Sequence, residues 1–165
     1  MVHPPAGNPT GVDPLLEAYE RHAGALLRLC LLLTGRQDVA EDIVQEAFVR
    51  SAPALGRLRA EEVRPYLRAV ALNLWRNRLR RAALEHRLRL ARTTKEELPF
   101  EERDALWAAI RRLPPRQRSC LVLRYYGELS ERETADALGC SVGTVKSQTS
   151  KALARLRKEL RSDVG

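Results

Sequence analysis

The chain has 165 residues, which is enough for one ordinary domain or for two small helical domains with modest cores. Lys and Arg number 29 against 21 Asp and Glu, so the formal net charge is +8 and a polyanion or an acidic protein surface is the favoured partner. No apolar run approaches the roughly 20 residues that a membrane-spanning helix needs, and the N-terminus lacks a signal-peptide pattern. We therefore expect no membrane contact and a cytoplasmic location, and a basic protein without a polyanionic partner stays open as the alternative.

The cysteines do not suggest metal binding. Cys30, Cys120 and Cys140 are far apart and lack the spacing of metal-ligand pairs, and no histidine lies near any of them in the sequence. We expect no metal site and no cofactor. Cys30 and Cys120 lie inside apolar runs, so both are predicted to be small core residues.

The N-terminal segment predicts a tail followed by a helix. Residues 1–12 are rich in Pro and Gly and are expected to be disordered. From Pro14 onward, apolar residues recur with helical spacing as far as Thr34, and Gly35 can take the left-handed conformation that ends a helix. A second helix is expected from Asp38 to Arg50, with the sequence DVAEDIVQEAFVR.

The second helix has two distinct faces. Apolar residues at i and i+4 spacing are expected to be buried: Val39, Ile43, Val44, Ala47 and Phe48. A different face collects Asp38, Asp42, Gln45, Glu46 and Val49. Acidic residues in a first turn also suit the helix dipole, which is an ordinary explanation for Asp38, Glu41 and Asp42. Gln45 and Glu46 lie in the middle of the helix, where that explanation does not apply.

A long basic helix is predicted next. Residues 51–61 include Pro53 and Gly56 and indicate a loop, and the third helix is expected to start around Pro65 and to run to Arg92. This segment contains a single acidic residue, Glu85. Its basic residues are Arg64, Arg68, Arg76, Arg78, Arg80, Arg81, Arg87, Arg89 and Arg92. The positive charges of these arginines repel one another unless an anion is bound. The interleaved residues Tyr66, Asn73, Trp75 and Asn77 can stack on bases or hydrogen-bond to them, and the alternative for the two aromatic residues is a place in the core.

The second half of the chain predicts a separate helical unit. Residues 93–102 are polar, acidic and interrupted by Pro, so they indicate a linker between units at 13–92 and 103–163. Four short helices are expected after it, at Asp104–Leu113, Pro115–Tyr126, Ser130–Leu138 and Val142–Arg161. No strand-like alternation appears, so the predicted fold is all-α, with two small helical domains joined by a flexible linker. The chain has no nucleotide-binding or zinc-protease motif, and we expect no enzyme.

The last two helices form a helix-turn-helix pattern. Ser130 and Glu133 satisfy a capping box, Gly139 ends the first helix, and Ser141 offers the N-cap of the second. The outward residues that can reach phosphates or base edges are Thr144, Lys146, Ser147, Gln148, Ser150, Lys151 and Arg155. Asp and Glu are absent from residues 141–158, as an approach to DNA requires. The alternative is an antiparallel helical pair with a solvated basic face.

Two segments together carry a family resemblance. The helix DVAEDIVQEAF, followed after the basic helix by LPPRQRSCLVLRYYGELSERETADALGCSVGTVKSQTSKALARLRKEL, closely resembles bacterial RNA polymerase sigma factors of the extracytoplasmic-function (ECF) type. The resemblance covers roughly residues 13–162, with the family's conserved region 2 in the first unit and region 4 in the second. It implies a dissociable specificity subunit that binds core RNA polymerase and selects promoters.

The resemblance also implies site residues. The contact with the clamp helices of the largest polymerase subunit would comprise Asp38, Glu41, Asp42, Gln45, Glu46 and Val49. The residues that hold and open the −10 element would be Tyr66, Asn73, Arg76, Asn77, Arg80 and Arg81, with Asn73 helping to pocket a flipped-out base. The −35 readers would be the outward residues of the last helix named above. The flap of the second-largest subunit would bind region 4, and an anti-sigma factor is a further candidate partner.

The sequence departs from the family in three places. A Trp common near Tyr66 is absent, Trp75 stands where an aliphatic residue is usual, and SQTSKA replaces the frequent SRLSRA, with Gln148 and Thr149 as the changed residues. The alternative to a sigma factor is a stand-alone helix-turn-helix regulator that binds duplex DNA and dimerises through its N-terminal unit. Binding to core polymerase through the second helix would discriminate between the two.

Overall fold

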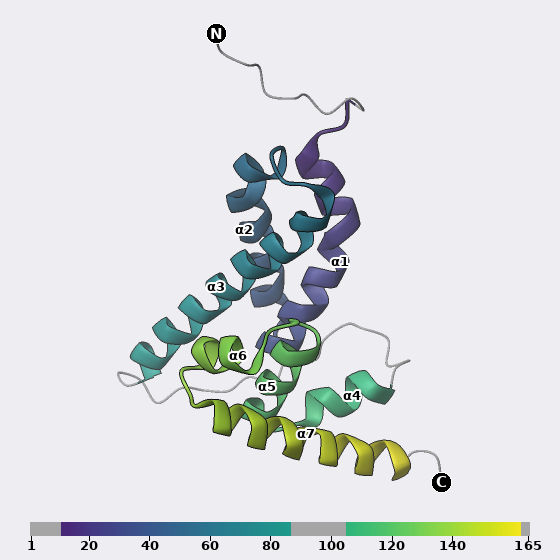
Figure 1. Cartoon of the computed structure of the whole chain (residues 1–165), viewed down its shortest axis with the longest axis vertical. Helices are drawn as coiled ribbons and strands as arrows, with labels where there is room; N and C mark the ends of the chain where they lie inside the picture. The colour runs from purple at the N-terminus through teal and green to yellow at the C-terminus, as the bar shows by residue number, and fades with distance from the viewer. Residues whose placement is uncertain (1–10, 87–104, 163–165) are drawn as a thin grey trace.

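The computed structural model describes residues 11–86 and 105–162, and all regular structure in these two ranges is helical (Figure 1). The helices are α1 (Pro14–Thr34), α2 (Gln37–Leu55), α3 (Ala60–His86), α4 (Ala105–Arg112), α5 (Pro115–Tyr125), α6 (Glu131–Leu138) and α7 (Val142–Ser162). The all-α prediction is therefore confirmed. The expected linker, the end of the third helix at 87–92 and most of the expected N-terminal tail lie outside the described residues.

Helices α1, α2 and α3 pack side by side as a three-helix unit (Figure 1). Asp13 caps α1 by accepting a hydrogen bond from the backbone N–H of Leu15 at 3.0 Å, and Gly35 ends the helix with φ +67°, as its sequence predicted. The core of the unit is formed by fully buried side chains, among them Leu32, Ile43 and Leu67. The predicted buried face of α2 is confirmed, except that Val39 is only half-buried.

Two helix boundaries differ from the sequence prediction, and both involve proline. Helix α2 continues through Pro53 to Leu55, because the buried side chains of Ser51 and Leu55 hold its last turn against the core. Helix α3 begins at Ala60 rather than near Pro65. Its start is stabilised by Glu62, whose carboxylate accepts a hydrogen bond from the backbone N–H of Arg59 at 2.9 Å. A proline close to a helix end removes only one backbone hydrogen bond, and packing and capping offset that loss.

Helices α4 to α7 form the second unit, with α5 and α6 packed on α7 (Figure 1). Ser130 and Glu133 make both hydrogen bonds of the predicted capping box, at 3.1 and 2.7 Å, and Gly139 ends α6 with φ +63°. These bonds hold the pKa of Glu133 below its ordinary value. The four predicted helices of this unit are confirmed to within one residue at each end.

The two units contact each other. Helix α5 packs against α1, and buried residues of both units belong to one continuous apolar cluster (Figure 1). Arg118 of α5 reaches Gly35 at the end of α1, where its guanidinium lies 3.7 Å from the position that a Cβ would occupy. Within the described ranges, none of the helices is both long enough and apolar enough to cross a membrane.

Candidate nucleic-acid interface

The outer face of α2 is a polar surface that the core does not use. The side chain of Asp42 is 67 % exposed, and the residue Val49 is also 67 % exposed. Glu41 and Gln45 are exposed beside them. Asp38 is also exposed, and its carboxylate accepts a 2.6 Å hydrogen bond from Arg36, which lowers the pKa of Asp38. Helical spacing thus places these side chains on one surface, opposite the stripe of buried residues, as the sequence predicted.

Glu46 differs from its neighbours because it has structural partners. Its carboxylate lies 2.5 Å from Arg50 on α2 and 3.5 Å from Arg78 on α3, and Arg78 also lies 3.8 Å from Asp42. These ion pairs link α2 to α3 across their polar edges. The predicted interface residue Glu46 is therefore half-buried and also contributes to the packing of the first unit. No local sequence pattern identifies Arg78 as its partner.

One face of α3 carries exposed polar and basic side chains. Four of the residues predicted to contact DNA are exposed: Asn73, Asn77, Arg80 and Arg81. Tyr66 is exposed as well, whereas Arg76 is half-buried and donates a 2.6 Å hydrogen bond to Oδ1 of Asn73. The bond fixes the orientation of the Asn73 amide on this surface.

The two aromatic residues of α3 have different environments. Trp75 is only 4 % exposed and belongs to the core, so it is unavailable for stacking on bases. Tyr66 lies at the surface with its ring partly exposed. The two explanations left open for these aromatic residues thus separate: Trp75 is a core residue, and Tyr66 remains a candidate for contact with nucleic acid.

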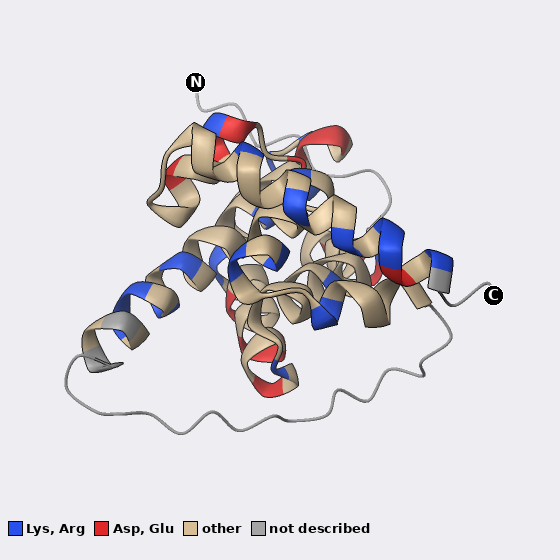
Figure 2. Cartoon of the chain, turned by 90° about the horizontal axis from the view of Figure 1, so that it is seen from below, with Lys and Arg blue, Asp and Glu red and all other residues tan. Residues whose placement is uncertain are grey.

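Helix α7 presents a basic surface free of acids over most of its length (Figure 2). Ser141 caps it by accepting a hydrogen bond from the backbone N–H of Thr144 at 3.1 Å. The side chains of five predicted contact residues are exposed: Lys146, Ser147, Ser150, Lys151 and Arg155. Lys146 lies 3.6 Å from Glu131 of α6, and Thr144 and Gln148 are half-buried.

The inward face of α7 packs against the rest of the protein, except at its first residue. Val145, Ala152 and Leu156 are buried, and Leu153 and Leu160 pack against the core. Val142, the first residue of the helix, is 38 % exposed.

One acidic residue, Glu128, has long-range partners that its position in the sequence does not predict. Glu128, in the turn between α5 and α6, forms ion pairs with Arg64 and Arg68 of α3 at 3.0 and 2.9 Å. Hydrogen bonding and charge from Arg68, with a further contribution from Arg64, hold the pKa of Glu128 below its ordinary value. Glu128 lies about sixty residues from both arginines in the sequence, so no local sequence pattern predicts these ion pairs.

The thiols are consistent with a structural role. Cys30 and Cys120 are buried as predicted, and burial raises the pKa of Cys30 to about 12 and also raises that of Cys120. Among the described residues, no group of three or more His, Cys, Asp or Glu side chains is arranged to hold a metal ion. The surfaces of α2, α3 and α7 are therefore the candidate functional features of the described chain.

Two family models match the chain, in the same order as the two helical units. The model of sigma-70 region 2 matches residues 18–85, and the model of sigma-70 region 4 matches residues 103–156. The first match contains α2 and nearly all of α3, and the second contains α4 to α6 and most of α7.

Several curated proteins are similar to the chain over most of its length. An RNA polymerase sigma-E factor of Streptomyces avermitilis is 37% identical over 152 residues, which cover 88% of this chain and 85% of that protein. The sigma-E factor of Streptomyces coelicolor is also 37% identical, with 87% and 85% covered. The ECF sigma factor SigW of Bacillus subtilis is 27% identical, and 90% of each chain is covered.

A solved structure has a similar fold. The sigma factor RpoE of Bartonella quintana, crystallised with the anti-sigma factor NepR, matches with a TM-score of 0.65 over 92% of this chain and 99% of that chain. The two sequences are 21% identical. The arrangement of helices is therefore one that has been observed in another protein.

Proposed function

The chain belongs to the sigma-70 family and is an ECF sigma factor that directs transcription initiation, and on this premise we propose which of its surfaces carry out each step. The observation that carries the proposal is the presence, on one chain, of an exposed polar face on α2 and an exposed acid-free face on α7. One surface binds the polymerase and the other binds promoter DNA. The protein acts as a dissociable specificity subunit, without catalytic chemistry of its own.

The outer face of α2 binds the clamp helices of the largest subunit of core RNA polymerase. Its exposed carboxylates suit a basic partner surface, and Val49 adds an exposed apolar side chain that contact with the polymerase would bury. Gln45 can both donate and accept hydrogen bonds at the centre of this face. The contact set comprises Asp38, Glu41, Asp42, Gln45, Glu46 and Val49.

The exposed face of α3 binds the −10 element and assists its opening. Arg80 and Arg81 can follow the phosphates of a separated strand, and Tyr66 can stack on a base. Asn73, oriented by its hydrogen bond from Arg76, can hold a base that has left the stack. Asn77 completes the set. Capture of an unpaired base lowers the free energy of the open duplex, which makes opening favourable without a nucleotide cofactor.

Helix α7 reads the −35 element in the major groove of duplex DNA. Lys146, Ser147, Ser150, Lys151 and Arg155 are exposed and able to donate to phosphates or base edges. Gln148 occupies a position where the family usually has a basic residue, and an amide prefers adenine where an arginine prefers guanine. Gln148 and Thr149, the two residues that differ from the usual family pattern, are therefore expected to shift the preferred −35 sequence.

Two further partners follow from membership of the family. The flap of the second-largest polymerase subunit binds the region 4 unit, and an anti-sigma factor inhibits the free protein. The second partner is supported by the similar fold of RpoE from Bartonella quintana, which was crystallised with the anti-sigma factor NepR. A stand-alone helix-turn-helix regulator is not favoured, because models of both sigma regions match this chain in order.

The test of this assignment is binding to core RNA polymerase from the source organism. We expect Asp42→Asn combined with Gln45→Ala to weaken binding by at least about tenfold, since centrally placed polar residues commonly dominate such interfaces. Glu20→Gln is the matched control, because it removes an exposed carboxylate from α1 and is expected to leave binding unchanged. Equal binding by the wild type, the double variant and the control would refute the assignment of α2.

A further inference from the structure

Two of the three cysteines lie together in the second unit. Cys120 belongs to α5, and Cys140 lies in the turn between α6 and α7. Both thiols line one cavity of about 190 Å³. Cys140 also packs against a small apolar cluster to which Cys120 belongs. Both cysteines are free, so the fold brings two unbonded thiols to a single place.

The charge of one thiol acts on the other. Burial is the largest cause that raises the pKa of Cys120, and the charge of a Cys140 thiolate raises it further. Arg116, which lines the same cavity, opposes the rise. Charges shift a neighbouring pKa mainly at short range, within about 4–6 Å. The electrostatic effect therefore agrees with the shared cavity in placing the two side chains near each other.

The two thiols differ in their access to solvent. Cys140 is half-exposed, whereas Cys120 is 2 % exposed. A dissolved oxidant therefore reaches Cys140 first, and Cys120 reacts only with a group that is already inside the cavity. An accessible thiol beside a second, resolving thiol is the arrangement of a redox-sensitive pair. Two cysteines that served only as small core residues would both be covered.

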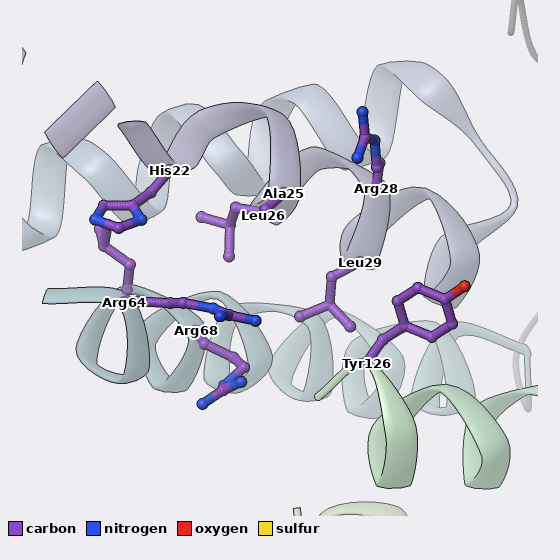
Figure 3. A pocket seen from close by; sticks show the side chains of 9 residues that line it. His22, Ala25, Leu26, Arg28, Leu29, Arg64, Arg68 and Tyr126 are labelled. Carbon is purple, nitrogen blue, oxygen red and sulfur yellow. The ribbon is translucent and has the colours of Figure 1, made fainter. Parts of the chain in front are cut away.

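The third thiol has a different environment. Burial raises the pKa of Cys30 to about 12, and the neighbouring charge that opposes the rise belongs to Arg78 rather than to another thiol. A cavity of about 140 Å³ between α1 and α3 has Leu26, Leu29 and Arg68 in its lining, and none of its lining residues is a cysteine (Figure 3). Cys30 is therefore an internal control for oxidation.

Cys140 is directly connected to the start of α7. Its backbone N–H donates a 3.0 Å hydrogen bond to the carbonyl oxygen of Ala135 in α6. The next residue, Ser141, caps α7 by accepting a hydrogen bond from the backbone N–H of Thr144. Thr144 and Gln148 line the same cavity as the two thiols. A displacement of the Cys140 backbone is therefore transmitted to the cap and to the first turn of α7.

The apolar cluster around Cys120 is small. Its buried members are Cys120, Ala135 and Val145, one from each of α5, α6 and α7. Val145 is fully buried and holds the beginning of α7 against the other two helices. Because so few side chains join the three helices here, a covalent bond at the edge of this cluster changes how α7 is held.

We propose that Cys120 and Cys140 form a reversible disulfide in the presence of a peroxide, and that this bond weakens the reading of the −35 element by α7. The inference rests on the proposed function, since the affected helix is the one assigned to that element. A disulfide fixes its sulfur atoms about 2.05 Å apart and its Cβ atoms about 3.8 Å apart, closer than unbonded thiols pack. The bond draws the turn toward α5 and disturbs the cap at Ser141.

The reaction needs only a peroxide as oxidant. The Cys140 thiolate attacks one oxygen of hydrogen peroxide, the O–O bond breaks and hydroxide leaves, so that Cys140 becomes a sulfenic acid. The Cys120 sulfur gives up its proton and attacks the Cys140 sulfur; the S–S bond forms, the S–O bond breaks, and hydroxide leaves. In total the two thiols lose two electrons and two protons, and the peroxide becomes two water molecules. A dithiol reductant reverses the reaction.

The test begins with the full-length chain, which is reduced, treated with hydrogen peroxide and freed of the oxidant. Mass spectrometry of the digested protein should then find the peptides of Cys120 and Cys140 joined, with Cys30 still a thiol. Holoenzyme is assembled from oxidised or reduced chain, and fluorescence anisotropy measures its binding to promoter DNA. We expect the oxidised form to bind about fivefold more weakly, the factor that corresponds to loss of one helix cap, and dithiothreitol to restore the affinity.

Three variants separate this effect from misfolding and from damage elsewhere. Cys140→Ser, at a half-exposed position, should bind promoter DNA equally before and after peroxide. Cys120→Ala removes the resolving thiol, so Cys140 should remain a sulfenic acid that dimedone labels, and its melting temperature shows whether the chain is folded. Cys30→Ala keeps the pair and is the matched control; it should respond to peroxide as the wild type does.

Absence of the joined peptides after peroxide treatment would overturn the proposal, and so would equal promoter affinity of the oxidised and reduced chains. A loss of affinity in Cys140→Ser as large as in the wild type would also overturn it. Run-off transcription on the same samples distinguishes these failures from failure of the proposed function. If even the reduced chain directs no promoter-specific transcription, the proposed function is wrong, and the joined peptides still decide whether the disulfide forms.

Discussion

Adjacent polar residues on α2 have different roles at the scale of single side chains. Gln45 is exposed, whereas Glu46 is linked to Arg50 and Arg78 and helps to hold α2 against α3. A pattern of polar residues on one helical face predicts that they share a surface, but it does not reveal which of them have a partner on another helix. The pair between Glu46 and Arg78 spans 32 residues and depends on the packing of two helices.

The three cysteines provide a test of the core at single-residue resolution. Iodoacetamide at pH 8 should modify half-exposed Cys140 first and leave Cys30 and Cys120 unmodified in the folded protein. Both are buried, and with a pKa of about 12 only about one Cys30 in 10⁴ is a thiolate at this pH. Mass spectrometry of the alkylated peptides measures the order of reaction.

The same experiment in denaturant is the control, because all three thiols should then react at similar rates. The reactivity of Cys30 should also rise with pH in the folded protein, since its thiolate fraction increases as the pH approaches the raised pKa. Modification of Cys30 in the folded chain as fast as Cys140 would contradict its place in the core between the helices of the first unit.

At the scale of helices, the sequence predicts ends well where a cap has a local signature. Gly35, Ser130 and Gly139 each cap or end a helix as their positions in the sequence indicated. The predictions failed at α2 and α3, where proline was taken as a boundary. Tertiary packing of Leu55 and capping by Glu62 outweigh the single hydrogen bond that each proline removes. These are effects that proline spacing alone does not encode.

The basic surface of α7 predicts how DNA binding depends on salt concentration. Lys151→Ala should weaken binding of the holoenzyme to promoter DNA and reduce the slope of log affinity against log salt by about one, because one phosphate contact is lost. The weakening should be similar on different promoter sequences, as expected for a phosphate contact. Anisotropy titrations of labelled promoter DNA across a range of salt concentrations measure both quantities.

Arg161→Ala serves as the control for Lys151→Ala. It removes one exposed positive charge from the last turn of the same helix, after the end of the acid-free segment, and should change the salt slope little. If the two variants have equal slopes, Lys151 does not contact phosphate, and the orientation of α7 in the groove is not the one proposed.

At the scale of the whole molecule, the sequence predicts two helical units but not how they meet. The contact depends on Glu128 with Arg64 and Arg68, on α5 against α1, and on Arg118 beside Gly35. Every one of these contacts joins residues that are distant in the sequence, and none belongs to a local motif. The family resemblance predicted the surfaces, whereas their proximity in one closed arrangement emerges only from the three-dimensional structure.

The central claim is that one chain binds core RNA polymerase through α2 and reads a promoter at two points through α3 and α7. Run-off transcription tests it most directly, with core RNA polymerase and a library of promoters from the genome of the source organism. The account predicts transcripts from a limited set of promoters that require this protein, and their loss when Asp42→Asn and Gln45→Ala are combined. No transcript above that of core polymerase alone, together with tight binding of duplex DNA by the free protein, would contradict it.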